Sequence, residues 1–188
     1  MKHFFLTIIL LNTSLIIFAQ LDKGTWLVGG NGNYQSTKIE DREPFTYNNG
    51  TSKELILSPN FGYFIKDKLC FGLKPNFRTY KGTFIGGSPN ANWFDLGPFS
   101  RYYFMDKEKQ FNVLTELSTQ FGIFNDLKVK TSTTTIFSAM AGIEAFFNSS
   151  CGVELLIGYQ NSNEKFENGV KRKSGLQIKI GFQLHLIK

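Results

Sequence analysis

The residues at positions 176–186 alternate strictly between apolar and polar types. Leucine, isoleucine or phenylalanine occupies every even position, and glutamine, lysine, glycine or histidine every odd one. Because successive side chains of a β-strand point to opposite faces, this period of two predicts a strand with one apolar face. Similar patterns occur at 26–34, 55–63, 69–78, 93–104, 111–121, 136–147 and 151–159. The chain is therefore predicted to contain eight strands, each close to the roughly 9 to 11 residues with which a tilted strand crosses a bilayer.

The connections between these segments alternate in length. Long polar connections occupy 37–52, 82–92, 124–134 and 161–173, whereas short ones occupy 65–68, 105–110 and 148–150. Antiparallel strands would place all the short turns at one end of a sheet and all the long loops at the other. This asymmetry is typical of barrels with short periplasmic turns and longer extracellular loops. We predict an all-β fold, an eight-stranded antiparallel closed transmembrane β-barrel.

An internal repeat supports the same register. The stretches SPNFGYFIKDK (58–68) and GPFSRYYFMDK (97–107) align, with a weaker third copy in GIEAFFNSS (142–150). Each copy ends a strand with aromatic residues next to a tight turn, and aromatic rings are favoured at the boundary between a bilayer and water. The alternative is ordinary repetition of hairpins in a soluble β protein.

The amino terminus predicts export. Lys2 and His3 precede an apolar run at 4–18, and Ala19 follows it, as in a secretory signal peptide. We therefore predict two parts, a signal peptide at 1–19 and a barrel domain at 20–188. Removal of residues 1–19 takes away Lys2 and leaves 20 basic against 15 acidic residues. This small, scattered excess in an exported chain gives no indication of nucleic-acid binding.

The whole of 20–188 resembles the small eight-stranded outer-membrane β-barrels of Gram-negative bacteria, the porin-family barrels of the OmpA and OmpX kind. The resemblance rests on the opening GTWLVGG, the two repeated strand ends and the closing KIGFQLHL. It implies an outer-membrane location and insertion by the barrel-assembly machinery. The family's assembly signal corresponds here to Lys179, Gly181, Leu184 and Leu186. The chain departs from the family pattern by continuing through Ile187 to Lys188, whereas such chains usually end on an aromatic residue.

The strand parity places charged residues inside the predicted barrel. Arg101 shares a face with Asp95, and the short turn at 105–110 sets it opposite Glu116 or one diagonal step away, where a charge-assisted contact is available. Five acids and four bases have inward parity: Glu54, Asp95, Glu116, Glu144, Glu154, Lys74, Arg78, Arg101 and Lys179. Since the interior of an eight-stranded barrel is just wide enough for side chains to fill it, these residues predict a plugged lumen.

Two glutamates in this set have two possible roles. Glu144 and Glu154 should face each other across the turn at 148–150, which could form a cation site or a pH-sensitive gate. A structural ion-pair network is the interpretation we favour. We predict no catalytic site, because no motif ties His185 to a nucleophile, and no cofactor or metal site. The glycines of GGNGNY (29–34) are explained by crowding on a strand face rather than by a dinucleotide site.

These observations predict a structural or surface-interaction protein of the outer membrane, not an enzyme. We expect a monomer that contacts outer-membrane lipid and lipopolysaccharide, with any surface ligand bound by the four loops. One alternative is a narrow channel for small solutes. Another is an exported soluble barrel of the lipocalin kind that binds a small apolar ligand, which would require apolar residues inside and polar residues outside.

Overall fold

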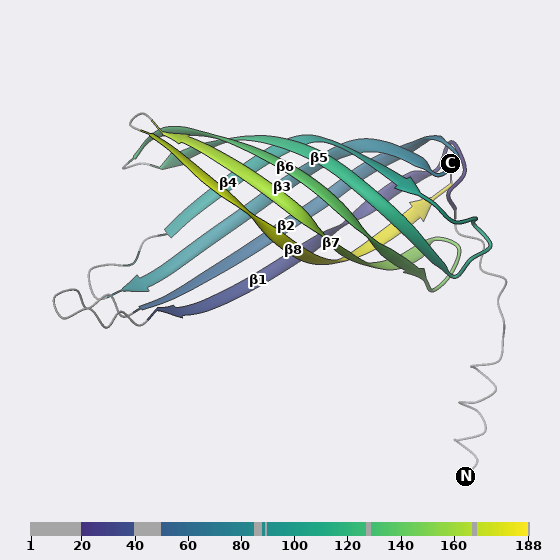
Figure 1. The fold of residues 1–188 in the computed structure, drawn as a ribbon, viewed down its shortest axis with the longest axis horizontal. Coiled ribbons are helices and arrows are strands. Elements are labelled where there is room, and N and C mark those ends of the chain that lie inside the picture. Colours follow the sequence, from purple (N-terminus) through teal and green to yellow (C-terminus); the bar gives the residue numbers. More distant parts are fainter. Residues whose placement is uncertain are drawn as a thin grey trace, which may run out of the picture.

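The chain forms a closed barrel of eight antiparallel strands in a computed structural model that describes residues 20–39, 50–84, 88, 90–126, 129–166 and 169–187 (Figure 1). Each strand pairs with the next, and β1 pairs with β8. The strands are β1 (Trp26–Ile39), β2 (Gly50–Lys66), β3 (Leu69–Phe84), β4 (Asn90–Tyr103), β5 (Phe111–Asp126), β6 (Val129–Phe146), β7 (Cys151–Phe166) and β8 (Gly169–Leu186). The predicted fold class and all eight predicted strands are confirmed. The predicted signal peptide at 1–19 lies outside the described residues.

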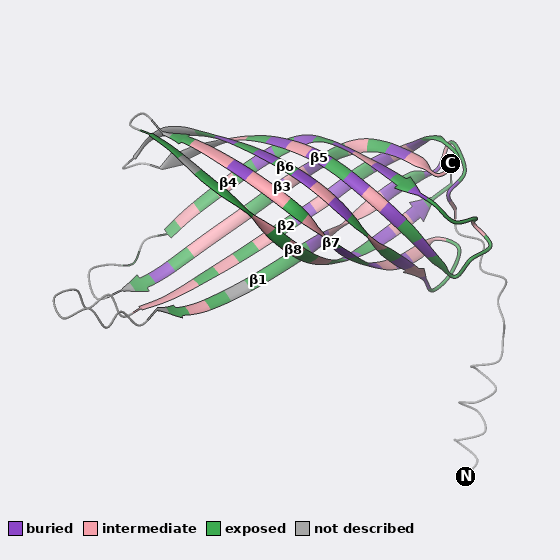
Figure 2. Ribbon diagram, in the orientation of Figure 1, coloured by how far each residue is buried: buried purple, intermediate pink, exposed green. Residues whose placement is uncertain are grey.

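Burial alternates along the strands as the period of two requires, which Figure 2 shows as bands of buried and exposed residues. In β4, Asp95 is 1% exposed and its neighbour Leu96 is 41% exposed. The exposed residues of the middle of the barrel are large and apolar. They include Leu57, Phe61, Leu73, Phe77, Phe94, Leu117, Phe121, Phe137, Ile143, Leu155, Ile157, Ile178, Ile180 and Phe182. The outer surface therefore carries an apolar belt, and the polar residues face inward. The described residues contain no helix that is long and apolar enough to cross a membrane.

The strands extend further toward the loop end than the sequence predicted. The predicted bounds 37–52, 82–92, 124–134 and 161–173 are wrong, because much of each segment is strand; β5 and β6 still pair at Asp126 and Val129, and β7 and β8 at Phe166 and Gly169. A strand of 14–18 residues, rising about 3.4 Å per residue and tilted by about 40°, spans roughly 40 Å along the barrel axis. The apolar band of such barrels is only about 25 Å tall. The polar segments therefore continue the barrel wall beyond the apolar belt.

Pairing is incomplete at several places in the described ladders; between β4 and β5, for example, it skips Gly97 and Pro98. Between β1 and β8 it stops at Gly32 and Ile180, and Figure 1 shows these strands diverging toward the loop end. Between β2 and β3 it is interrupted in the stretch that contains Pro59 and Pro75. Proline has no backbone N–H to donate to a neighbouring strand, which accounts for the interruption. The wall is thus most continuous near the tight turns.

Candidate functional site in the barrel lumen

The lumen contains a buried network of charged side chains centred on Arg101. Its Nη2 donates to Glu116 Oε2 at 2.6 Å, and its Nε donates to the same oxygen at 3.2 Å. Its Nη1 lies 2.8 Å from Glu154 Oε2. Lys74 Nζ donates to Glu116 Oε1 from the other side. All four side chains are at most 2% exposed. Two bases and two acids therefore neutralise one another in a region without solvent, where unpaired charges would be costly.

The strand register explains why these residues meet. Arg101 is directly opposite Glu116 in the pairing of β4 with β5, and Glu144 is directly opposite Glu154 in the pairing of β6 with β7. The two glutamates have different partners. Glu154 contacts Arg101 and accepts a hydrogen bond from Gln183 Nε2 at 2.9 Å. Glu144 has a separate set of partners.

Glu144 connects the network to the turn end of the barrel. Its Oε2 accepts a hydrogen bond from the Tyr103 hydroxyl at 2.7 Å, and its Oε1 lies 2.9 Å from His185 Nε2. Arg101 Nη1 donates to the same Tyr103 oxygen at 3.3 Å. Tyr103 and His185 are fully buried. A continuous chain of polar contacts therefore runs from Lys74 to His185 across the lumen.

Aromatic side chains close the barrel below this network. The rings of Phe64, Tyr103 and Phe146 surround His185, with ring centroids 5.2 to 6.0 Å from the imidazole. Leu21 and Leu27 are buried in the same cluster. Edge and tilted contacts of this kind add to the stabilisation that burial gives. The layer fills the cross-section at the tight-turn end.

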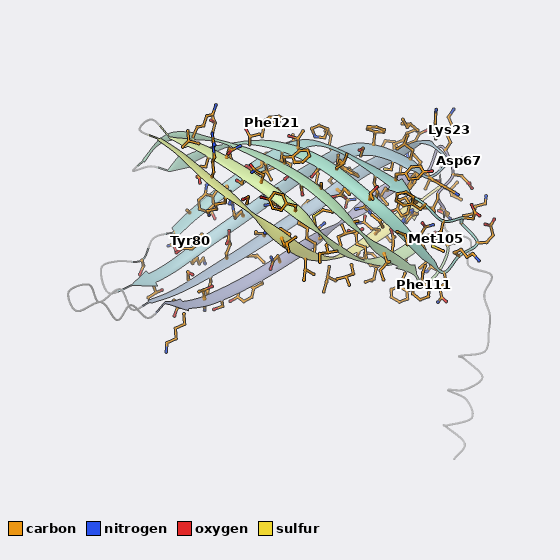
Figure 3. All side chains as sticks on the ribbon, viewed as in Figure 1. Lys23, Asp67, Tyr80, Met105, Phe111 and Phe121 are labelled. Carbon is orange, nitrogen blue, oxygen red and sulfur yellow. The ribbon has the colours of Figure 1, made fainter. Side chains whose placement is uncertain are left out.

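The segment that precedes β1 seals this end. The Gln20 N–H donates to the Ser149 carbonyl at 3.1 Å, and the Gln20 carbonyl lies 3.1 Å from His185 Nδ1. The Leu21 carbonyl accepts a hydrogen bond from the N–H of Lys68 at 2.8 Å. The Lys23 N–H donates to Asp67 Oδ1 at 2.8 Å; Figure 3 places both residues at the end with the tight turns. The backbone of residues 20–25 thus ties together turns that are far apart in sequence.

Ion pairs join the turns on the outside of this seal. Lys68 Nζ lies 2.5 Å from Asp106 Oδ1, and Lys107 Nζ lies 2.9 Å from Asp22 Oδ2. The hydrogen bond to Asp106 raises the pKa of Lys68 above its ordinary value, and the same contact lowers the pKa of Asp106. The charged groups of both ion pairs are accessible to water, so each pair contributes little to the stability of the fold.

The loop-side half of the lumen is hollow. A cavity of about 40 Å³, here called the upper cavity, lies above the network and is lined by residues of seven strands, all of them polar except Ile56 and Ile136. It continues into a wider space of about 190 Å³, the mouth, which shares Asn33, Ile56, Arg78, Gln160 and Gln177 with it. Lys74, Arg78 and Lys179 line the upper cavity, and Glu54 and Lys173 line the mouth. The barrel is therefore closed at one end and hollow at the other.

The remaining predicted lumen residues lie beside this space. Asp95 is buried and accepts a hydrogen bond from Asn76 Nδ2 at 3.0 Å. The Arg78 guanidinium lies over the Trp93 ring, 4.7 Å from its centroid. Lys179 Nζ donates to Gln160 Oε1 at 3.4 Å. The nine predicted residues thus fall into two groups, a paired network and the lining of the cavity and mouth.

The residues of the predicted assembly signal lie on both faces of β8. Lys179 faces the upper cavity, and Gly181 is buried, whereas Leu184 and Leu186 have the outward parity. A Cβ at Gly181 would lie 2.6 Å from Glu154 Oε1 and 2.7 Å from the Gly30 carbonyl oxygen. Packing alone therefore accounts for a glycine at position 181, because a larger residue would leave no room for the Glu154 carboxylate.

Sequence reasoning missed Tyr103, Gln183, Asn60 and the role of His185. Asn60 Nδ2 donates to Gln183 Oε1 at 3.0 Å, and Gln183 in turn donates to Glu154. All four residues have inward parity, which the alternation did indicate. Most of their partners come from strands that are not neighbours in the sheet, which no local pattern identifies. No group of three or more His, Cys, Asp or Glu side chains in the described part of the chain has the arrangement of a metal site.

Comparison with solved structures supports the fold. The barrel superposes on the outer membrane protein OprG from Pseudomonas aeruginosa with a TM-score of 0.53 and 15% identity, covering 92% of this chain and 100% of that one. Neisserial surface protein A gives a TM-score of 0.48 at 18% identity, covering 86% and 97%. No family model and no curated protein matches the sequence. The predicted resemblance to small eight-stranded outer-membrane barrels is confirmed at the level of the fold.

Proposed function

We propose that the protein is an integral outer-membrane barrel with a closed lumen, and that it has a structural or surface-interaction role carried by its loop end. The observation that carries this proposal is the closure of the turn end by the Arg101 network, the aromatic layer and residues 20–25. In the proposed orientation the closed end faces the periplasm and the hollow end faces outward, as in barrels with short periplasmic turns.

The apolar belt supports residence in a membrane. Leu176, Ile178 and Ile180 are each more than 60% exposed. In water such a contiguous apolar surface would promote aggregation, whereas in a bilayer it faces lipid tails. A lipocalin-like soluble barrel would need the opposite arrangement, with polar residues outside. Outer-membrane lipid and lipopolysaccharide are therefore the proposed surroundings, and the barrel-assembly machinery is the proposed route of insertion.

The closure argues for a non-conducting barrel. An ion that moved along the axis would have to displace Arg101 from two glutamates and then pass the ring layer at Phe64 and Tyr103. Separating a buried ion pair has a high free-energy cost, because it leaves a charge buried without its partner. A narrow channel is the second candidate within this fold, and the hollow loop-side half of the lumen is the observation that favours it.

Two measurements test this proposal. The first compares gel mobility in SDS of heated and unheated outer-membrane fractions. A shift that depends on heating, with the protein absent from the soluble periplasm, is the expected result; recovery as a soluble protein without a shift would refute membrane residence. The second is conductance of the purified protein in a planar bilayer. We expect no conductance above that of the bilayer alone. Steady single-channel currents would refute the closed barrel and support the narrow channel.

A further inference from the structure

The upper cavity has an excess of positive charge. Lys74, Arg78 and Lys179 line it, and no aspartate or glutamate is among the described residues that do. Lys74 is neutralised by Glu116 below. In the described part of the chain, Arg78 and Lys179 form no salt bridge of their own. Two cations therefore face a confined space without a salt bridge of their own, although the Asp95 carboxylate is near enough to Arg78 to attract its charge. Coulomb interactions in such a space are stronger than in bulk water.

The cavity also presents hydrogen-bond donors without acceptors. Asn31 is 8% exposed, lines the cavity and has no partner for its side-chain Nδ2. The Nε of Arg78 is also buried and without a partner. Lys179 Nζ makes one long hydrogen bond, 3.4 Å to Gln160. Buried polar groups in folded proteins are normally hydrogen-bonded, so the two donors without a partner, together with the weakly bonded Lys179 ammonium, indicate a place for a further acceptor.

The nearby carboxylates do not supply this acceptor. Glu116 is already bonded to Lys74 and Arg101. Asp95 is buried near Arg78, but its Oδ2 accepts from Asn76 and its Oδ1 has no hydrogen-bond partner, so it attracts Arg78 without a hydrogen bond to it. Glu54 lies in the mouth, together with Lys173. Water could satisfy the amide of Asn31, but it would not neutralise Lys179. An anion with several acceptor oxygens satisfies both needs.

We propose that the upper cavity binds a small oxyanion, either a free carboxylate or a free phosphate group, between Arg78, Lys179 and Asn31. The proposal rests on the proposed function above and gives its surface-interaction role a ligand class. A volume of about 40 Å³ admits on the order of three water-sized groups. A carboxylate group, with three non-hydrogen atoms, fits there. A phosphate group, with five, reaches from the cavity into the wider mouth, which has room for the rest of a small solute. The closed floor makes this a binding site rather than a pathway.

The test is calorimetric titration of the purified barrel in detergent micelles at low ionic strength, with inorganic phosphate as the probe. We expect phosphate to bind, and Lys179→Gln and Arg78→Gln each to weaken it roughly tenfold or more, since hydrogen bonds to charged groups are among the stronger ones. Glutamine keeps a polar residue at both positions. Lys109→Gln at the turn end removes the same charge from an exposed site and should bind phosphate like the wild type.

A fluorescence readout reports on the site directly. The chain has two tryptophans, Trp26 and Trp93, so Trp26→Phe leaves only Trp93, whose ring lies under Arg78. Phosphate should change its emission in that background, and glucose, an uncharged probe, should not. The proposal is overturned if the folded, heat-modifiable protein binds no phosphate, or if a variant that carries both Lys179→Gln and Arg78→Gln binds it as well as the wild type. It is also overturned if glucose produces the same response. A conducting or soluble protein would instead refute the proposed function.

Discussion

Removal of the Arg101 side-chain charge is the sharpest test of the lumen network. In Arg101→Met the guanidinium is lost, and with it the contacts to Glu116 at 2.6 and 3.2 Å and to Glu154 at 2.8 Å. Glu116 keeps Lys74 as a partner. Glu154 keeps only the neutral donor Gln183. The substitution therefore leaves one buried carboxylate without a counter-charge.

The expected cost follows from that imbalance. Removal of one partner from a buried ion pair costs about 3–5 kcal/mol, because the other charge stays buried and uncompensated. The double variant Arg101→Met, Glu154→Gln removes both charges and should recover roughly 2 kcal/mol of that loss, since neutral replacements of a whole pair are tolerated much better. Arg172→Met is the matched control. Arg172 is exposed, so its substitution should change stability by less than about 0.5 kcal/mol.

The assay is urea unfolding of protein refolded into lipid vesicles, followed by tryptophan fluorescence, with heat-dependent gel mobility as a check of folding. The free energy of unfolding is taken from the midpoint and slope of each transition. The argument fails if Arg101→Met lies within about 1 kcal/mol of the wild type, or if the costs of the two single substitutions simply add in the double variant.

Three further predictions use the same unfolding assay. Gly181→Ala should lose about 1–3 kcal/mol even when the chain refolds without assembly machinery, because its Cβ would meet Glu154 and Gly30; unchanged stability would mean that Gly181 acts only in recognition by the assembly machinery. Phe64→Ala should lose about 3–5 kcal/mol by opening a cavity in the ring layer, and a smaller loss would mean that the layer repacks. Asp106→Asn removes the ion pair between Asp106 and Lys68 and should lower the free energy of unfolding slightly. This small difference from the wild type should be fully present between pH 3.8 and 10.5. It should fade as the pH falls through the lowered pKa of Asp106 or rises through the raised pKa of Lys68; a pH-independent difference would contradict the ion pair.

The barrel itself could be predicted from the sequence because its two determinants are local. Alternation fixes which side chains face the lumen, and a short turn fixes the register of its two strands, so the pairing of Arg101 with Glu116 follows from the connection between β4 and β5. The loop bounds could not be predicted in the same way. The polar residues at 124–126 and 129–134 predict a loop, but they belong to β5 and β6. Beyond the apolar belt a strand needs no apolar face, so the alternation that identifies a strand is absent there.

The contacts across the lumen could not be predicted, because they depend on how the sheet closes. His185 and Glu144 lie on β8 and β6, and Asn60 and Gln183 lie on β2 and β8. The tilt and stagger of a closed barrel decide which inward residues share a level, and neither quantity is encoded in any one segment. The seal by residues 20–25 depends on the same closure, since it uses backbone groups of distant turns.

The positions of the charged residues along the barrel axis explain why their total number gave no indication of a site in the upper cavity. Five acids and four bases face inward, which suggests a nearly neutral lumen. The structure separates them: Glu116, Glu144 and Glu154 belong to the paired network near the turn end, whereas Arg78 and Lys179 line the cavity above it. The other two acids lie on the cavity side, Asp95 near Arg78 and Glu54 in the mouth, but in the described part of the chain no salt bridge joins either of them to Arg78 or Lys179. The network near the turn end is therefore paired within the described chain, whereas Asn31, Arg78 and Lys179 present the donors that the proposed ligand would engage.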